Sequence, residues 1–354
     1  MNDPKVYKLW QDGNSVGIFQ FESQGMTNFM KELKPDCLED IIAGVSLYRP
    51  GPMDQIPRYI ANKKDPEHAV YTHPALKPIL EVTYGCMVYQ EQVMQIVRDL
   101  AGYSLGRADL VRRAMGKKKL DVMAKEREVF IHGQVDEDGK VIVPGCVRNG
   151  IDEVSANKIF DEMAEFAKYA FNKSHAAAYA VVAYQTAWLK YYYPVEFMAS
   201  LMTSVMDNST KVSEYTLTCR KMNIEILPPD INEGEGGFSV AGNAIRYGLS
   251  AIKGVGRPVI ETIIAEREAN GAFSNLEDFC SRLNGRELNK RTIENFIKAG
   301  AFDSFGGTRK QFMMIYVQVM DTVNQEKKSS MTGQMSLFAV SYTHLRAHET
   351  CADL

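Results

Sequence analysis

The chain has 354 residues, of which 45% are hydrophobic and 24% are charged, and its formal net charge at pH 7 is -3. This composition is typical of a soluble globular protein with two or three domains, and it excludes binding to nucleic acid through overall charge. The six cysteines form no C-x-x-C pair, which argues against a zinc site or a disulfide framework and favours a reducing cytoplasm. The N-terminal residues lack an apolar core of the signal-peptide type, and the longest weakly charged run, residues 174–189, falls short of the ~18 residues of a membrane span. We therefore expect a cytoplasmic protein without membrane association.

Apolar periodicity predicts that most of the first 232 residues are helical. One stripe of apolar residues predicts a helix over 89–103 that ends near Gly102. The alanine-rich run 176–189 predicts a helix that is buried on most sides and capped by Ser174. Two further helices are expected, over 194–206 and 211–222.

Residues 134–145 predict a β-hairpin whose type I′ turn is Asp138-Gly139. Asp136 and Asp138 suggest a metal site as an alternative, because two-metal sites need clustered carboxylates. Acidic residues are common beside a D-G dipeptide for reasons of turn geometry alone. We therefore favour the hairpin and assign no metal ligand.

The most concentrated charge lies around the segment RRAMGKKK at residues 112–119. Between residues 107 and 119, Asp109 is the only acidic residue. Such a concentration around a short glycine-containing turn suits a triphosphate or a nucleic-acid backbone. The alternative is a solvated basic helix face. The basic residues of this region are Arg107, Arg112, Arg113, Lys117, Lys118 and Lys119.

Two other places offer groups that suit a phosphate. The segment RPGP at residues 49–52 fixes a turn and holds Arg49 at a rigid corner, although a surface turn with an incidental arginine is the alternative. The start of the alanine-rich helix presents a lysine, a hydroxyl and an imidazole at the positive end of the helix dipole, which suits a phosphate or a sugar. A structural histidine is the alternative there. The residues concerned are Asn172, Lys173, Ser174 and His175.

The segment ILPPDIN at residues 226–232 is an extended connector and the best domain boundary in the chain. A small hairpin over 238–247 follows it, and then the sequence IKGVG, which resembles the turn of a helix-hairpin-helix. Its glycines would expose backbone amides to a DNA phosphate without reading the base sequence. A capping box at Ser274-x-x-Glu277 and a degenerate second copy, with Gly300 at its turn, strengthen the DNA-binding interpretation over a plain helical turn. The candidate DNA-binding residues are Lys253, Gly254, Val255, Gly256 and Gly300.

Residues 316–338 are expected to be a linker that carries a short apolar anchor, GQMSLF. This anchor resembles the peptide by which bacterial replication proteins bind the sliding clamp, with Gln334, Met335, Leu337 and Phe338 as its contact residues. Residues 339–354 fit nothing before them and resemble translated adaptor sequence, so we expect a non-native tail. His344 and His348 within it have the spacing of a helical metal pair, but we assign no metal there.

Taken together, the segments IFQFES, LYRPGP, RRAMGKKK, FNKSHAAAYA, ILPPDIN, IKGVG and GQMSLF resemble, in this order, the alpha-subunit family of bacterial DNA polymerase III. The resemblance covers about residues 3–338. It implies a mainly α fold with a few short β-hairpins. It also implies a polymerase fingers domain over 1–232, a tandem helix-hairpin-helix domain over 233–315, and the clamp-binding peptide after them.

The resemblance further implies a DNA-directed DNA polymerase that acts on dNTPs and primer-template DNA. Its Mg²⁺ ions would be held by palm aspartates upstream of Met1, so no catalytic residue is expected in this chain and the isolated chain is expected to be inactive. Arg49, Arg112, Arg113 and Lys117–Lys119 would surround the triphosphate, and Asn172–His175 would lie by the nucleotide sugar and phosphates. The sliding clamp and other polymerase III holoenzyme subunits would be its partners. The alternative is a non-catalytic module that binds DNA and the clamp.

Overall fold

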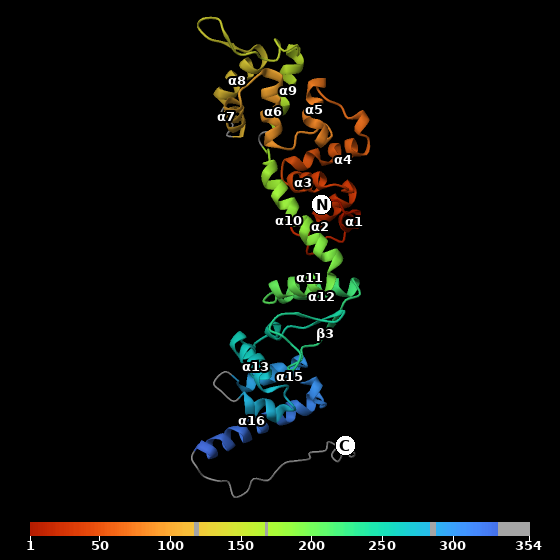
Figure 1. The fold of residues 1–354 in the computed structure, drawn as a ribbon, viewed down its shortest axis with the longest axis vertical. Helices are drawn as coiled ribbons and strands as arrows, with labels where there is room; N and C mark the ends of the chain where they lie inside the picture. The colour runs from red at the N-terminus through yellow and green to blue at the C-terminus, as the bar shows by residue number, and fades with distance from the viewer. Residues whose placement is uncertain (117–119, 167–168, 284–287, 332–354) are drawn as a thin grey trace. The chain divides into compact units, whose positions relative to one another are not determined.

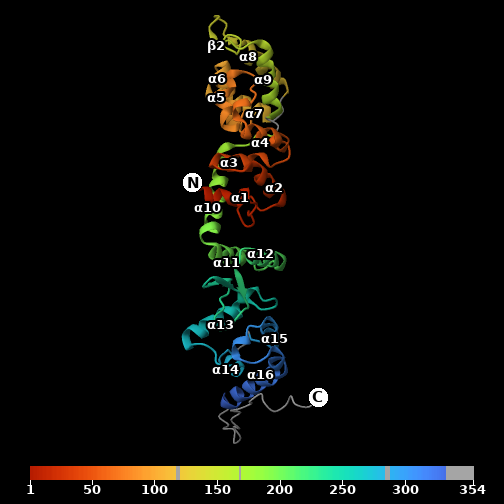
Figure 2. The same cartoon turned by 90° about the vertical axis from the view of Figure 1, so that its right-hand side faces the viewer.

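The computed structural model describes residues 1–116, 120–166, 169–283 and 288–331. The chain divides into two compact units, unit 1 over Met1–Pro194 and unit 2 over Val195–Leu354. Both units are mainly helical with a few short strands, which confirms the predicted fold class (Figures 1 and 2).

Unit 1 contains helices and one two-stranded sheet. Its helices are α1 Pro4–Gln11, α2 Gln24–Leu33, α3 Leu38–Leu47, α4 Ile56–Lys64, α5 Lys77–Leu80, α6 Gln90–Ala101, α7 Leu105–Gly116, α8 Leu120–His132, α9 Glu153–Phe166 and α10 Lys173–Tyr192. Its strands are β1 Gln134–Val135 and β2 Val141–Val143.

Two hydrophobic clusters divide unit 1 into two lobes (Figure 1). The first lobe consists of α1–α4 packed against α10, and the second lobe consists of α5–α9 with the β1–β2 hairpin. The chain enters the second lobe after α4 and returns to the first lobe at Phe171, which forms a parallel β-bridge with Tyr89. The start of α6 and the start of α10 therefore lie side by side.

Helix α10 packs on the first lobe through a stripe of small residues. Ala176, Ala180, Ala183 and Ala187 follow the helical period and are fully buried, which allows close approach of α3. The expectation that this helix is buried on most sides was wrong, because Trp188 and other residues away from the stripe are exposed. Composition alone misled here, since alanine tolerates both environments.

The start of α10 also differs from its prediction. The helix begins at Lys173, and the side chain of Asn172 caps it by accepting a hydrogen bond from the amide of His175 (2.8 Å). Ser174 was predicted to be the cap, but it lies inside the first turn. Both residue types cap helices well, so sequence alone did not separate them.

Helix α6 forms as predicted, with Val93, Ile96, Val97 and Leu100 buried and with Gly102 ending it in a left-handed conformation (φ 77). The 134–145 hairpin is also confirmed.

The turn of the 134–145 hairpin, however, is not of type I′, because that type needs positive φ at both central residues. Of Asp138 and Gly139, only the glycine has positive φ (78). The side chain of Asp136 accepts the amides of Asp138 (3.1 Å) and Lys140 (2.8 Å). Asp136 therefore serves the turn.

Unit 2 begins with two helices and continues with a small sheet and a second helical group. Its helices are α11 Pro194–Ser204, α12 Ser209–Lys221, α13 Arg257–Asn270, α14 Leu276–Arg282, α15 Lys290–Ala299 and α16 Arg309–Met331. Its strands are β3 Glu225–Leu227, β4 Ser239–Ala241 and β5 Ala244–Arg246.

The sheet of unit 2 has the strand order β3-β5-β4, with β3 parallel and β4 antiparallel to β5. The predicted hairpin over 238–247 is thus confirmed as β4–β5, with Gly242 at positive φ (64). The connector 226–232 begins inside β3, so its first residues belong to the sheet.

A phenylalanine-rich core joins α13–α16. Residues 316–331, expected to be linker, continue helix α16 instead, and Met320 and Val323 contribute to this core. The predicted capping box at Ser274-x-x-Glu277 does not form, and Asn275 caps α14 instead. Asn275 accepts the amide of Asp278 (2.9 Å), and the Asp278 carboxylate accepts the amide of Ser274 (2.9 Å).

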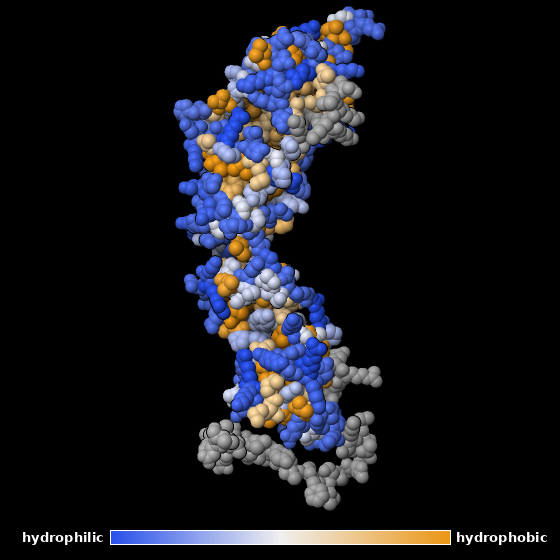
Figure 3. Space-filling view, turned by 180° about the vertical axis from the view of Figure 1, so that it is seen from behind, coloured by the Kyte–Doolittle hydropathy of each residue, from blue (hydrophilic) through white to orange (hydrophobic). Residues whose placement is uncertain are grey.

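Among the described residues, no helix is both long enough and apolar enough to cross a membrane. The face shown in Figure 3 is mostly hydrophilic, with small, separated apolar patches. Scattered apolar residues of this kind are normal on a protein surface.

Candidate nucleotide and DNA-phosphate sites

The predicted phosphate-binding residues of unit 1 meet around the first turn of α6. Gln90 donates its backbone amide to the carbonyl of Phe171 (2.9 Å) and its side-chain Nε2 to the carbonyl of Ala170 (3.0 Å). The Oε1 of the same side chain accepts a hydrogen bond from Nη1 of Arg112 (2.8 Å). Gln90 therefore connects Arg112 on α7 to the segment that leads into α10.

Arg112 and Arg113 lie in a helix, not in the glycine-containing turn that the sequence suggested. Asp109 binds both of them: its Oδ1 accepts from Nη2 of Arg112 (2.7 Å), and its Oδ2 lies 2.6 Å from Nη2 of Arg113. Arg112 and then Arg113 hold the pKa of Asp109 below its usual value. The Arg113 side chain is 61% exposed and that of Arg112 is 28% exposed, so Arg113 is the more accessible of the two.

Arg107 has a structural role. Its guanidinium binds Glu126 of α8 and lies 5.0 Å from the ring centre of Tyr103. Lys117, Lys118 and Lys119 lie outside the described residues.

The start of α10 is held by two carboxylates. The amide of Lys173 donates to both oxygens of Glu91 (3.0 and 3.1 Å), and its Nζ lies 3.1 Å from Glu39. Ser174 and His175 are exposed in the same turn. Ser174 and His175 therefore place a hydroxyl and an imidazole at the start of a 20-residue helix, where Glu91 binds the amide of Lys173 and Asn172 binds that of His175.

Aromatic rings continue from this turn along one side of α10. The ring of His175 lies 5.5 Å from that of Phe171 and 4.1 Å from that of Tyr179. The guanidinium of Arg49 stacks over the other end of the row, 3.9 Å from the ring centre of Phe171. Arg49 thus lies at the same corner as the start of α10, although RPGP is separated from it by more than a hundred residues in the sequence.

An open cavity of about 250 Å³ borders this corner. Gly51 of the RPGP turn and Tyr169 line it, together with Arg58 and Glu162. Gly51 has a positive φ (102), and a Cβ at this position would lie 2.4 Å from the Tyr169 ring, so the turn requires glycine.

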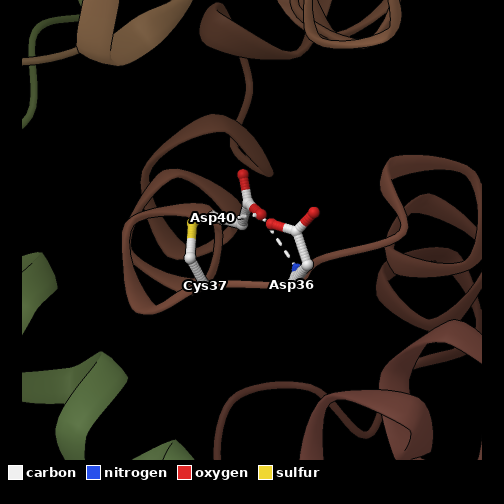
Figure 4. Close-up of side chains that lie close together, drawn as sticks. All are labelled: Asp36, Cys37 and Asp40. Atoms are coloured by element: carbon white, nitrogen blue, oxygen red, sulfur yellow. Dashed lines mark hydrogen bonds between the residues drawn. The ribbon is translucent and has the colours of Figure 1, made fainter. Parts of the chain in front are cut away.

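One group of three potential metal ligands occurs among the described residues, namely Asp36, Cys37 and Asp40. Figure 4 shows them at the start of α3, with the Asp36 amide donating to the Asp40 carboxylate (3.0 Å). The ammonium of Lys63 binds Asp40 and lies 3.4 Å from Asp36. Because a lysine already provides the cation, this group is a buried ion pair that fixes α3 against α4, and it does not fit a two-metal site.

In unit 2, the predicted first hairpin places Lys253, Gly254 and Gly256 on the surface and Val255 half-buried before α13. Gly254 has positive φ (80). Helix α13 begins after Gly256 with no side-chain cap, so its first amides are not satisfied by a capping side chain.

Gly300, at the predicted second hairpin, is different. It is buried, and its amide closes the end of α15 by donating to the carbonyl of Ile297 (3.1 Å). The guanidinium of Arg309 covers it, since a Cβ on Gly300 would lie 2.1 Å from Nη2 of Arg309. Gly300 therefore does not present its amide to solvent as Gly254 does. The clamp-binding candidates Gln334, Met335, Leu337 and Phe338 lie outside the described residues.

Sequence reasoning missed Gln90, Glu91 and the double role of Asp109. In the sequence, Gln90 and Glu91 are simply polar residues at a helix start. No local signal indicated that Gln90 has a partner 22 residues away and Glu91 one 82 residues away. The spacing of Asp109 from Arg112 and Arg113 on one helix was a usable signal for ion pairs.

Two parts of the chain match known protein families. Residues 1–138 match the model of the bacterial DNA polymerase III alpha subunit finger domain, and residues 223–312 match the helix-hairpin-helix motif. The chain is 47% identical to DNA polymerase III subunit alpha of Xylella fastidiosa (strain Temecula1) over 340 residues. It is 45% identical to the proteins of that name from Chlamydia trachomatis serovar D, over 343 residues, and Thermus aquaticus, over 344 residues.

These matches define a polymerase finger domain followed by a helix-hairpin-helix region. Each match to a relative covers 96% of this chain. The chain belongs to the DNA polymerase III alpha subunit family, as the resemblance predicted, and it spans 26 to 28% of the length of these relatives.

Proposed function

We propose that unit 1 binds the triphosphate of an incoming deoxynucleoside triphosphate as part of a replicative DNA polymerase. The observation that carries this proposal is the continuous set of contacts from Arg112 through Gln90 to Phe171 and Arg49. It brings together basic residues from three distant segments at the start of a long helix.

The chemistry of this corner suits a triphosphate. An arginine guanidinium can bind two phosphate oxygens at once, and the dipole of a helix N-terminus favours an anion. In this proposal Arg49, Arg112 and Arg113 contact phosphates, as would Lys117–Lys119. Asn172, Lys173, Ser174 and His175 lie by the sugar and the nearest phosphate.

The second part of the proposal concerns DNA. The exposed turn at Lys253, Gly254 and Gly256, followed by the uncapped start of α13, would hold the phosphates of primer-template duplex without reading its sequence. Gly300 is left out of this contact because it is buried under Arg309.

Bond formation would require residues outside this chain. Polymerases of the two-metal type need clustered carboxylates for Mg²⁺, and the candidate group among the described residues is taken by Lys63. We therefore derive no catalytic step here and expect the isolated chain to be unable to extend a primer. In the proposed assembly the protein is cytoplasmic, Gln334–Phe338 bind the sliding clamp, and other holoenzyme subunits complete the enzyme.

Calorimetric titration with dATP, ATP and inorganic tripolyphosphate tests the nucleotide site. We expect dATP to bind more tightly than tripolyphosphate, because only a nucleotide pocket also contacts the sugar and base. Equal affinities, together with retained binding to duplex DNA, would instead support the non-catalytic DNA- and clamp-binding module, which the surface turn before α13 also permits.

A further inference from the structure

We infer that Gln90 is a positioning residue of the nucleotide site, which acts through Arg112 and through the start of α10. This inference rests on the proposed function of unit 1. Gln90 is half-buried, and both ends of its side-chain amide bind the protein: Oε1 accepts from Arg112, and Nε2 donates to the carbonyl of Ala170.

The geometry of an amide side chain explains why this residue type suits the position. Glutamine combines an acceptor and a donor on one planar group. Arg112 can only donate, and the Ala170 carbonyl can only accept, so one glutamine satisfies both at once. A glutamate would keep the acceptor and lose the donor.

Gln90 can fix the position of Arg112 because the backbone of Gln90 is itself held in place. The buried side chain of Gln92 accepts the amides of Val88 (2.8 Å) and Tyr89 (3.0 Å), and it donates to Oγ1 of Thr83 (2.8 Å). Glu91, the next residue after Gln90, holds the amide of Lys173 with both carboxylate oxygens (3.0 and 3.1 Å). The first turn of α6 is therefore a rigid support from which neighbouring side chains reach the two halves of the site.

Asp109 alone does not fix the direction of Arg112. It lies on the same helix, three residues earlier, and moves with α7. The Gln90 side chain links this guanidinium to the segment that leads into α10. Helix α10 supplies further groups of the site.

The test is a double-mutant cycle on the full chain, measured as dATP affinity. Gln90→Ala should weaken dATP binding about tenfold, since a misplaced guanidinium loses a charge-assisted hydrogen bond. In an Arg112→Ala background the same change should cost clearly less, because only the contact to the start of α10 is then left to lose. An equal loss in both backgrounds would overturn the inference. Gln95→Ala, an exposed glutamine of the same helix, is the matched control.

Hydrogen exchange of the unliganded chain gives a second readout, which does not depend on nucleotide binding. Gln90→Ala should speed exchange in segments 105–114 and 169–176, whereas Gln90→Glu should do so mainly in 169–176, because it keeps the acceptor for Arg112. If the wild-type chain binds no triphosphate, the proposed function fails, and the exchange data still decide the role of Gln90. Unchanged exchange in both segments would refute it.

Discussion

The two proposed phosphate sites are built from different parts of the polypeptide. In unit 1, side chains from α6, α7, the RPGP turn and α10 converge, and contacts between residues distant in the sequence connect these segments. In unit 2, the site is a local turn around Gly254 whose backbone is offered directly. Under the proposed function, the first site would distinguish one ligand from another, because its donors have fixed directions. The second would bind any phosphate that fits the turn.

The two glycine turns of unit 2 sharpen this contrast. Gly254 and Gly300 both have positive φ (80 and 88), and both follow short apolar runs. Arg309 covers only Gly300, and Asp303 fixes that arginine (2.6 Å). Two glycine turns with the same local sequence signal therefore differ in the structure: Gly300 is buried, and Gly254 lies on the surface.

The largest effect is expected for Arg112→Ala. Loss of a charge-assisted hydrogen bond to a phosphate costs about 1.5–3 kcal/mol, so dATP affinity should fall roughly ten- to a hundredfold. Titration calorimetry measures this, and Arg148→Ala, which removes an exposed arginine elsewhere in unit 1, is the control. Equal affinities for the two variants would show that the basic residues of α7 are only a solvated helix face.

Gly254→Val should come next. A β-branched residue at φ 80 strains the turn by about 1–2 kcal/mol, and its Cβ would lie 2.7 Å from Nδ2 of Asn295. The added side chain should also prevent close approach of a phosphate. We expect duplex affinity to fall about tenfold in fluorescence anisotropy. Gly306→Val separates the two causes, since Gly306 has a similar φ (82) and open space around it. Equal losses of DNA affinity in both variants would mean that strain alone is responsible.

Lys253→Ala should have a smaller effect. One lost phosphate contact should reduce the slope of log K against log salt by about one unit. Lys221→Ala, at an exposed position of α12, should leave the slope unchanged. An unaltered slope for Lys253→Ala would place the DNA contact elsewhere in unit 2.

Local features were predictable from sequence, and long-range ones were not. The apolar stripe of α6, the two hairpins and the exposed turn at Gly254 follow from short-range rules that depend on neighbouring residues. The predictions of the Asp138-Gly139 turn type and of the α10 cap were wrong, because in each case two local conformations suit the same residues. The role of Gln90 was not predictable, since its partners lie 22 and 80 residues away and only tertiary packing brings them together.

The smallest effect is expected for Asp109, which binds Arg112 and Arg113. Arg112 and Arg113 lower its pKa in the folded protein from the ordinary value of 3.8. A carboxyl group with a lowered folded pKa stabilises the protein above its unfolded pKa, and this contribution is lost as the pH falls through the folded value. Asp109→Asn should therefore lower the melting temperature slightly at pH 7, and the difference from wild type should shrink as the pH falls below about 4. Asp138→Asn, an exposed carboxylate in the hairpin turn, is the control. A difference for Asp109→Asn that does not change with pH would mean that its ion pairs with Arg112 and Arg113 contribute nothing to folding, and that Gln90 holds Arg112 in place without the help of a carboxylate.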